Sequence, residues 1–246
     1  YLDTLDGLVY TPRTDKPYTG KVLDLYANGN KMMEGAYKDG WMDEIWTYYY
    51  PDGVTKAEGQ FLRSDGGNVH ELSGIPQNGR YGDWTIYYPS GNVNAKYQYN
   101  VKGKFNQDRQ EWYDNGNKKI EMHYVNGIPD GPRVEWSENG QKELEYSYVN
   151  GKKDGNWTAW YENGNKKNHY FYVKGKKSQT WTVWWSNGNI KTEGNFKEGL
   201  KNGQFTFWFQ NGQKKFEGVC RNDKLFGEWT FYNADGSVEK IKEYTN

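Results

Sequence analysis

The chain has 246 residues, with 32 basic and 32 acidic side chains, so its net charge of zero argues against nucleic acid and an anionic membrane surface as partners. Aromatic residues make up 18% of the sequence although the mean hydropathy is −1.13. A disordered chain would be poor in aromatic residues, so this composition excludes a disordered chain. Cys220 is the single cysteine, which excludes an internal disulfide, and no apolar run approaches the ~20 residues that a membrane helix needs.

Residues 1–20 lie outside the pattern that fills the rest of the chain and predict an N-terminal lead-in or cap. The chain begins at Tyr1, with no Met and no signal-like stretch, so we expect a processed or trimmed form. From residue 21 to residue 246, a glycine that ends an Asn-Gly, Asp-Gly or Ser-Gly pair recurs nine times, mostly at steps of 24 residues. These turn glycines are Gly29, Gly53, Gly91, Gly116, Gly140, Gly164, Gly188, Gly212 and Gly236. A fixed period of this size predicts an array of repeated supersecondary units.

Each unit predicts a β-hairpin. We number its positions from the turn glycine, position 0. Both flanks of the turn alternate with period two and are rich in Trp, Tyr, Phe and Thr, which is typical of strands. Further glycines, such as Gly151 and Gly155, predict a longer loop between one hairpin and the next. The chain as a whole therefore predicts an all-β fold, an elongated twisted antiparallel sheet of about nine 24-residue β-hairpin repeats.

The type of turn predicts which side chains share a face. A three-residue loop with its glycine in the left-handed conformation pairs position −3 with +1. Alternation then places positions −4, −6, +4, +6 and +8 on a structural face, for example Trp160 and Thr158. Positions −7, −5 and −3, such as Trp157, would form an exposed aromatic strip on the other face. Four charged residues interrupt that strip: Arg109, Glu111, Arg133 and Glu135.

The candidate binding residues lie on this strip and in an insertion. The strip contributes Trp157, Tyr161, Trp181, Trp185, Phe205 and Phe209. The insertion, roughly residues 62–78 of the second repeat, contributes His70 and Glu71. Insertions into repeats often lie on the binding face, and the alternative is a loop tolerated for its small entropic cost.

We expect no enzyme, no metal site and no cofactor. His123 and His169 occupy different positions in the repeat, and no histidine pair has the spacing of metal ligands. The Glu residues that recur at position +5 would form either an acidic binding strip or cross-strand pairs with lysine. Their sixfold repetition favours the pairs, because active sites are seldom repeated.

The unit G-x-W-T-x-W-Y-x-N-G-x-K-K-x-E-x-x-Y-V-N-G-K-x-x-G resembles the MORN repeat, and is similar to the bacterial variant found in YwqK-like antitoxins. The resemblance covers roughly residues 20–244 and implies an elongated sheet of successive hairpins. Residues 6–22, "DGLVYTPRTDKPYTGKV", look like the lead-in of bacterial MORN lipoproteins and exported proteins. This likeness favours an exported location, periplasmic or at the surface, over a cytoplasmic one.

Two functions follow as hypotheses. The first is a non-enzymatic scaffold that binds a protein partner and is antitoxin-like or surface-associated, since Trp and Tyr dominate protein recognition. The second is a carbohydrate or cell-surface-binding module, because the hairpins also resemble choline- and glucan-binding repeats and flat aromatic faces stack on sugar rings. End-to-end self-assembly through open sheet edges is a third alternative, against which the differing terminal segments argue.

Overall fold

The computed structural model describes residues 3–5, 8–68 and 73–245, and every regular element in these ranges is a β-strand. The chain forms two compact units, Tyr1–Ile128 and Pro129–Asn246. The first unit contains β1 (Asp3–Leu5), β2 (Leu8–Tyr10), β3 (Gly20–Leu25), β4 (Lys31–Lys38), β5 (Trp41–Tyr49), β6 (Thr55–Ser64), β7 (Arg80–Tyr87), β8 (Val93–Tyr99), β9 (Gln107–Trp112) and β10 (Lys118–Val125). The second contains β11 (Ile128–Trp136), β12 (Lys142–Val149), β13 (Lys152–Trp160), β14 (Lys166–Val173), β15 (Lys176–Trp184), β16 (Ile190–Lys197), β17 (Leu200–Trp208), β18 (Lys214–Arg221), β19 (Lys224–Tyr232) and β20 (Val238–Tyr244).

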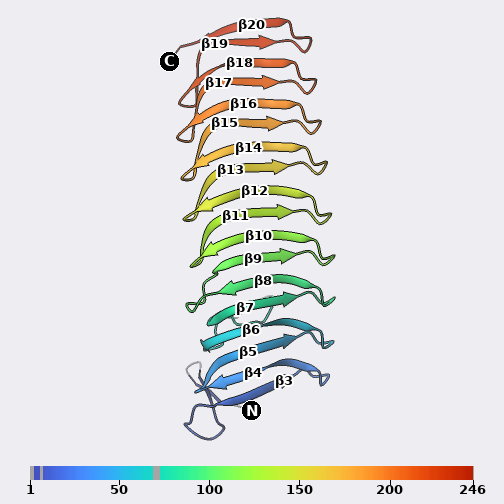
Figure 1. The fold of residues 1–246 in the computed structure, drawn as a ribbon, viewed down its shortest axis with the longest axis vertical. Helices are drawn as coiled ribbons and strands as arrows, with labels where there is room; N and C mark the ends of the chain where they lie inside the picture. Colours follow the sequence, from blue (N-terminus) through green and yellow to red (C-terminus); the bar gives the residue numbers. More distant parts are fainter. Residues whose placement is uncertain (1–2, 6–7, 69–72, 246) are drawn as a thin grey trace. The chain divides into compact units, whose positions relative to one another are not determined.

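Within each unit the strands form one antiparallel layer in chain order. Strands β3 to β10 pair consecutively in the first unit, and β11 to β20 do so in the second (Figure 1). The all-β class and the hairpin repeats predicted from the sequence are confirmed. Strands β1 and β2 pair with each other, and Val9 and Tyr18 are linked by hydrogen bonds to each other and to Gly40, in the turn between β4 and β5.

Every hairpin closes through the predicted three-residue loop. At Gly164 the N–H of Tyr161 donates to the carbonyl of Asn165 (2.8 Å), and the N–H of Gly164 donates to the carbonyl of Tyr161 (2.9 Å). Gly164 adopts φ +83°, the left-handed conformation that favours glycine. Position −3 therefore pairs with +1, as the sequence predicts.

A β-bulge next to this loop makes the predicted face assignment wrong. Trp160 pairs with Lys166, but Ala159 pairs with Asn168, so Lys167 at position +3 has no partner across the strand. The extra residue shifts the register by one, and a one-residue shift exchanges the two faces of a strand. Positions −7 and −5, and not −6 and −4, therefore share a face with +4, +6 and +8. We call this the inner face, and we call the face of −6, −4, +2 and +5 the outer face.

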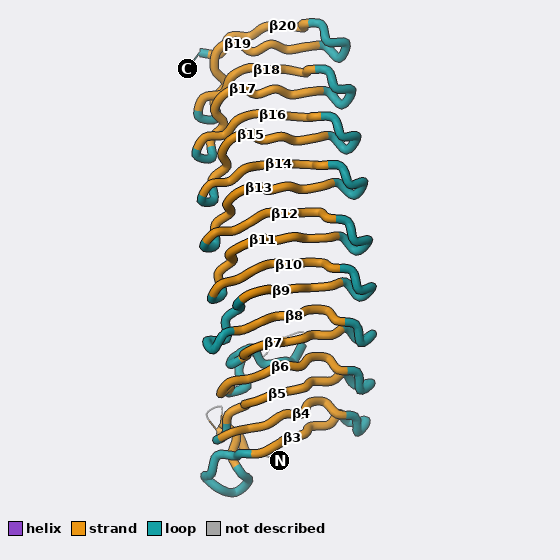
Figure 2. The backbone as a smooth tube through the Cα atoms, in the orientation of Figure 1, coloured by secondary structure: helices purple, strands orange, loops and turns teal. Residues whose placement is uncertain are grey.

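The connections between hairpins are tighter than predicted. Strands β12 and β13 are joined by the two-residue turn of Asn150 and Gly151, both with positive φ, as in the preferred type I′ hairpin turn. Gly155 does not belong to that connection, because it lies inside β13 at φ +84°. In the repeat that carries the insertion, β6 extends to Ser64 and β7 begins at Arg80. Figure 2 shows that the two kinds of turn lie at opposite ends of the strands in each unit.

The inner face is buried by rings that lie over glycines. The Trp229 side chain is 2% exposed, and a Cβ at Gly218 on the neighbouring strand would lie 2.3 Å from its ring. Trp46 and Trp84, both at position −7, lie over Gly35 and Gly59 in the same way. In these three pairs the indole N–H donates to the backbone carbonyl of the residue after the glycine, at 2.9–3.1 Å. A single-layer sheet thus buries large side chains against its own backbone.

The turn edge is held by asparagine side chains that reach the next hairpin. The Nδ2 atoms of Asn187 and Asn189 both donate to the carbonyl of Gln210 at 3.0 Å. Asn163 and Asn165 bind the carbonyl of Ser186 in the same manner, at 2.7 and 2.9 Å. These bonds satisfy turn carbonyls and align successive turns.

Replacing a flat-lying tryptophan should destabilise the second unit strongly. We expect Trp229→Ala to lower the free energy of unfolding by about 3–5 kcal/mol, because it removes a fully buried ring and leaves a cavity. Trp208→Ala, on the half-buried outer face, should cost clearly less. Urea denaturation of both variants checks this, and an equal or larger loss for Trp208→Ala would contradict the face assignment.

Single substitutions should measure how much each asparagine contact between turns contributes to stability. Asn187→Ala removes the bond to Gln210 and should cost about 1 kcal/mol. The matched control is Asn139→Ala, because the hydrogen bonds described for Asn139 stay within its own turn, to Ser137 and Gln141. Thermal unfolding should show a larger loss of stability for Asn187→Ala than for Asn139→Ala. Equal losses of stability would contradict the role assigned to the hydrogen bond between hairpins.

Candidate binding faces of the repeats

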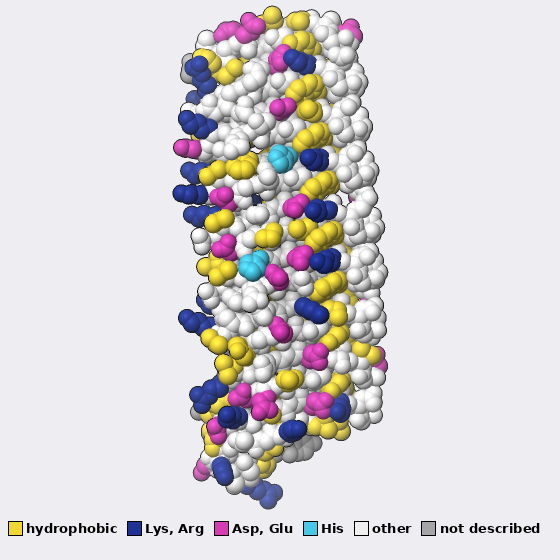
Figure 3. All heavy atoms as spheres, in the orientation of Figure 1, with side chains coloured by type: hydrophobic (Ala, Val, Ile, Leu, Met, Phe, Trp, Pro, Cys, Tyr) yellow, Lys and Arg dark blue, Asp and Glu magenta, His cyan; other side chains and the backbone are white. Residues whose placement is uncertain are grey.

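The outer face carries a repeated trio of Lys, Glu and an aromatic ring. Lys142 at position +2 lies 2.9 Å from Glu145 at +5, and its Nζ lies 5.6 Å from the ring centre of Trp160 on the next hairpin. Where the ring is tyrosine, its hydroxyl donates to the glutamate, as Tyr232 does to Glu217 at 2.7 Å. Figure 3 shows the resulting rows of hydrophobic and charged side chains in each unit. Most of the glutamates are thus paired, but the predicted cross-strand pairing with lysine is wrong: the lysine lies three residues away on the same strand, and the cross-strand partner is a tyrosine where one is present.

The two described histidines take part in local contacts on this sheet. His169 Nδ1 lies 3.0 Å from Thr158 Oγ1, and burial, with the nearby charge of Lys166, lowers the pKa of this histidine. His123 Nδ1 lies 2.8 Å from a carboxylate oxygen of Asp108. In the described ranges, no group of three or more His, Cys, Asp or Glu side chains is placed to hold a metal ion.

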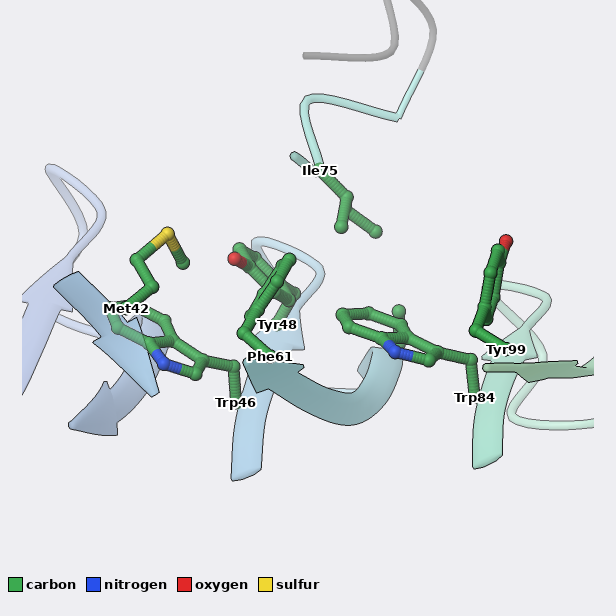
Figure 4. Close-up of a cluster of buried hydrophobic side chains, with 8 residues drawn as sticks. Met42, Trp46, Tyr48, Phe61, Ile75, Trp84 and Tyr99 are labelled. Atoms are coloured by element: carbon green, nitrogen blue, oxygen red, sulfur yellow. The ribbon is translucent and has the colours of Figure 1, made fainter. Parts of the chain in front are cut away.

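The inner face of the first unit is covered by part of the insertion. Ile75 is 1% exposed and belongs to the same cluster as the buried rings of Trp46, Phe61 and Trp84 (Figure 4). Arg80, at position −11, donates from Nε to the carbonyl of Pro76 at 2.8 Å. Its guanidinium lies 4.5 Å from the ring centre of Trp84. A segment of the insertion thus packs on this face and is held there by ring contacts and a cation.

In part of the second unit the inner-face rings pack beside tyrosine and not over glycine. The residue at +6 before Trp157 and before Trp181 is tyrosine instead of glycine, so the indole cannot lie flat over the backbone. The Nε1 atoms of both indoles lack a hydrogen-bond partner among the described residues. Tyr170 lies between them, 5.0 Å from the ring of Trp157 and stacked on Trp181 at 5.7 Å. These half-buried rings form a continuous aromatic row.

Two arginine–glutamate pairs occupy the inner face where the aromatic residues are interrupted. Arg133 Nε lies 2.7 Å from Glu135, two positions along β11 in the second unit. Arg109 pairs with Glu111 on β9 in the first unit, with Nε at 2.8 Å. The charges are therefore neutralised within their own strands.

The predicted strip residues divide into two groups. Trp157, Trp181 and Phe205 lie on the inner face, and Phe205 is only 1% exposed, so it is not the exposed residue that the sequence predicts. Tyr161, Trp185 and Phe209 lie at the start of the turns. Tyr161 and Trp185 donate to the carbonyls of Trp184 (2.9 Å) and Trp208 (3.3 Å), and Phe209 lies beneath Lys215 at 5.6 Å. His70 and Glu71 lie outside the described residues. Binding by any of these residues stays a prediction.

The sequence reasoning missed a set of lysines on the inner face. Lys153, Lys177 and Lys201 occupy position −11, the position of Arg80 in the first unit. Their Nζ atoms lie 4.8 Å from the ring centre of Tyr146, 4.0 Å from that of Tyr170 and 5.8 Å from that of Phe205, respectively. A lysine that recurs every 24 residues could have identified this set. The recurrence is hard to see in the sequence because Lys153 and Lys177 each follow another lysine.

The fold and these faces define a β-hairpin repeat protein whose function resides in surfaces built from repeated side chains. The sequence matches the family described as MORN repeat variant at residues 80–100, 108–126, 129–150, 153–174, 180–198 and 227–246, about half of the chain. The chain belongs to this family. Repeats of this kind commonly bind proteins or membranes. The described residues include no helix with the length and apolar character to cross a membrane.

The chain is also similar to parts of much longer solved structures. One is a Photorhabdus luminescens Tc holotoxin pore with a mutation in TccC3, at 10% identity and a TM-score of 0.24, covering 96% of this chain and 14% of that chain. Another is a TcdB2-TccC3-Cdc42 complex, at 11% identity and a TM-score of 0.18, covering 94% and 17%. This chain thus spans less than a fifth of either. No curated protein matches the sequence.

The outer-face trio should make stability depend on acid pH. Hydrogen bonds from Lys31 and Tyr49 hold the pKa of Glu34 below its ordinary value, so ionised Glu34 stabilises the folded state above the unfolded pKa of ~4.3. That contribution is lost as pH falls through the lower folded pKa. We expect Glu34→Gln to cost less than about 1 kcal/mol at pH 7 and less again at pH 3, measured by urea denaturation. The exposed-turn variant Glu162→Gln serves as the control, and an undiminished cost at pH 3 would contradict the assignment.

Proposed function

We propose that this protein is a non-enzymatic repeat scaffold that binds a partner protein through the inner face of its second unit. The observation that carries the proposal is the row of Trp157, Tyr170 and Trp181. These rings are half-buried, pack on one another and are flanked by lysines. Aromatic side chains of this kind dominate the binding energy of protein interfaces. Family membership supports the proposal, since such repeats commonly bind proteins or membranes.

The finer form of the proposal is an antitoxin-like or surface-associated scaffold in a bacterium. It rests on the resemblance of the repeat to YwqK-like antitoxins and of residues 6–22 to exported proteins. In this form the partner is a small toxic protein that the scaffold neutralises. Fractionation of the native host, followed by detection of the chain, tests the exported location.

A glycan-binding function is favoured by a separate observation on the outer face. Trp160 and Trp184 recur there one hairpin apart, half-buried, with the lysines Lys142 and Lys166 at 5.6 and 6.0 Å from their ring centres. Repeated flat rings with a fixed spacing could stack on successive sugar rings. Titration of tryptophan fluorescence with a panel of oligosaccharides, on the wild type and on Trp160→Ala/Trp184→Ala, separates this function from protein binding.

The scaffold function is tested by affinity capture with the full chain, followed by reconstitution from purified components. We expect one stoichiometric protein to co-elute with the chain in gel filtration and to bind Trp157→Ala/Trp181→Ala at least about tenfold more weakly. The matched control, Trp160→Ala/Trp184→Ala on the outer face, should bind normally. A captured protein that requires the outer-face rings would overturn the assignment, and a folded bait without any protein partner would overturn the function.

A further inference from the structure

The first unit shows what the inner face accepts. Residues 73–78 of the insertion lie over its rings, with Ile75 buried among them and the carbonyl of Pro76 bound to Arg80 at position −11. The occupant is therefore a short segment of chain without regular secondary structure, held by an apolar side chain on the rings and by a cation that binds a backbone oxygen atom.

Within residues 128–245, the second unit repeats this face without such a segment. Its strands from β11 to β20 are joined by turns of two or five residues, so no connection is long enough to fold back over the rings. Position −11 is again cationic, at Lys153, Lys177 and Lys201, and each ammonium group lies near a ring on the inner face. Both features of the first unit, the rings and the cation, are thus present three times in succession.

These three lysines lack carboxylate partners within ion-pair distance in the part of the chain that the structure describes. The carboxylates of Asp223 and Asp154 accept backbone N–H groups, from Lys201 (2.8 Å) and Lys174 (2.9 Å) respectively. Burial and the charges of Lys153 and Lys201 lower the pKa of Lys177, so the row is under mutual repulsion that an anion would relieve.

We propose that the inner face of the second unit, from β13 to β17, binds an extended acidic segment of a partner protein that crosses the strands along the lysine row. This inference rests on the scaffold function proposed above and names the chemistry of its partner. The segment places apolar side chains on Trp157, Tyr170 and Trp181, and its carboxylates face Lys153, Lys177 and Lys201.

The spacing of the row indicates the backbone of the segment. Successive lysines are one hairpin apart, which is two strand spacings or ~9.6 Å. A polyproline II segment rises ~3.1 Å per residue with three residues per turn, so acidic side chains three positions apart recur on one side every ~9.3 Å. In a segment with an acidic residue at every third position and proline between them, the spacing of the acidic side chains therefore matches the spacing of the lysines.

The test uses a fluorescein-labelled peptide of four Glu-Ile-Pro triplets, in which Ile-Pro copies residues 75–76 of the chain. Fluorescence anisotropy with the full protein should show binding that weakens as salt is added. The variant Lys153→Glu/Lys177→Glu/Lys201→Glu should bind at least about tenfold more weakly. The matched control Lys152→Glu/Lys176→Glu/Lys197→Glu, which changes the same charge at neighbouring positions of the outer face, should bind like the wild type.

Two further measurements separate loss of binding from loss of folding. Circular dichroism melting confirms that the variants are folded, and Lys153→Gln/Lys177→Gln/Lys201→Gln, a milder change, should also weaken binding. Three results would overturn the proposal. They are an equal loss of peptide binding in the two triple-glutamate variants, no binding of the peptide to the wild type, and equally strong binding of a peptide with four consecutive glutamates. Phosphatidylserine vesicles that bind through the row in place of the peptide would identify a lipid surface and overturn it too. A captured partner that still binds the row variant would leave the scaffold function standing and refute only this surface.

Discussion

Each hairpin contains one residue, three positions after its turn glycine, that has no partner on the facing strand. At Lys167 this bulge decides which side chains the sheet buries, because it shifts the register beyond it by one residue. The bulged lysine also lies over the ring at position −3, as Lys167 does over Tyr161 at 5.5 Å. One local feature therefore sets the inner face, the outer face and the contact that covers the turn.

A single layer of strands has no second layer to complete its core, so the burial of each ring depends on the neighbouring hairpin. Glycine at position +6 lets an indole lie flat and reach a backbone carbonyl, as Trp229 does with Val219. Tyrosine at +6 occupies that place with its own side chain, and Trp157 and Trp181 pack on the ring of Tyr170. The choice between glycine and tyrosine at one position thus separates fully buried rings from half-buried ones.

The period, the strand chemistry and the three-residue loop were predictable, because each rests on residues that recur in register. The bulge was not, because alternation reads the same on both sides of Lys167 and the residue at the unpaired position varies among lysine, glutamate, asparagine and methionine. The predicted face assignment failed for this reason, although the pairing of −3 with +1 was right. Trp157 and Trp181 were identified as candidates by their aromatic type. Lys153, Lys177 and Lys201 were missed because a surface lysine carries no signal until its face is known.

The pairing of positions +6 and −7 joins residues of different repeats, so the 24-residue unit is not self-contained. A unit that begins with tryptophan at −7 needs glycine at +6 in the unit before it if the indole is to lie flat, as with Gly218 before Trp229. Gain or loss of whole units during evolution therefore keeps the fold but changes these junctions. Each such event can replace a ring that is buried over glycine by one that is not, or the reverse. The order of the units, as well as their number, therefore decides which rings the inner face exposes.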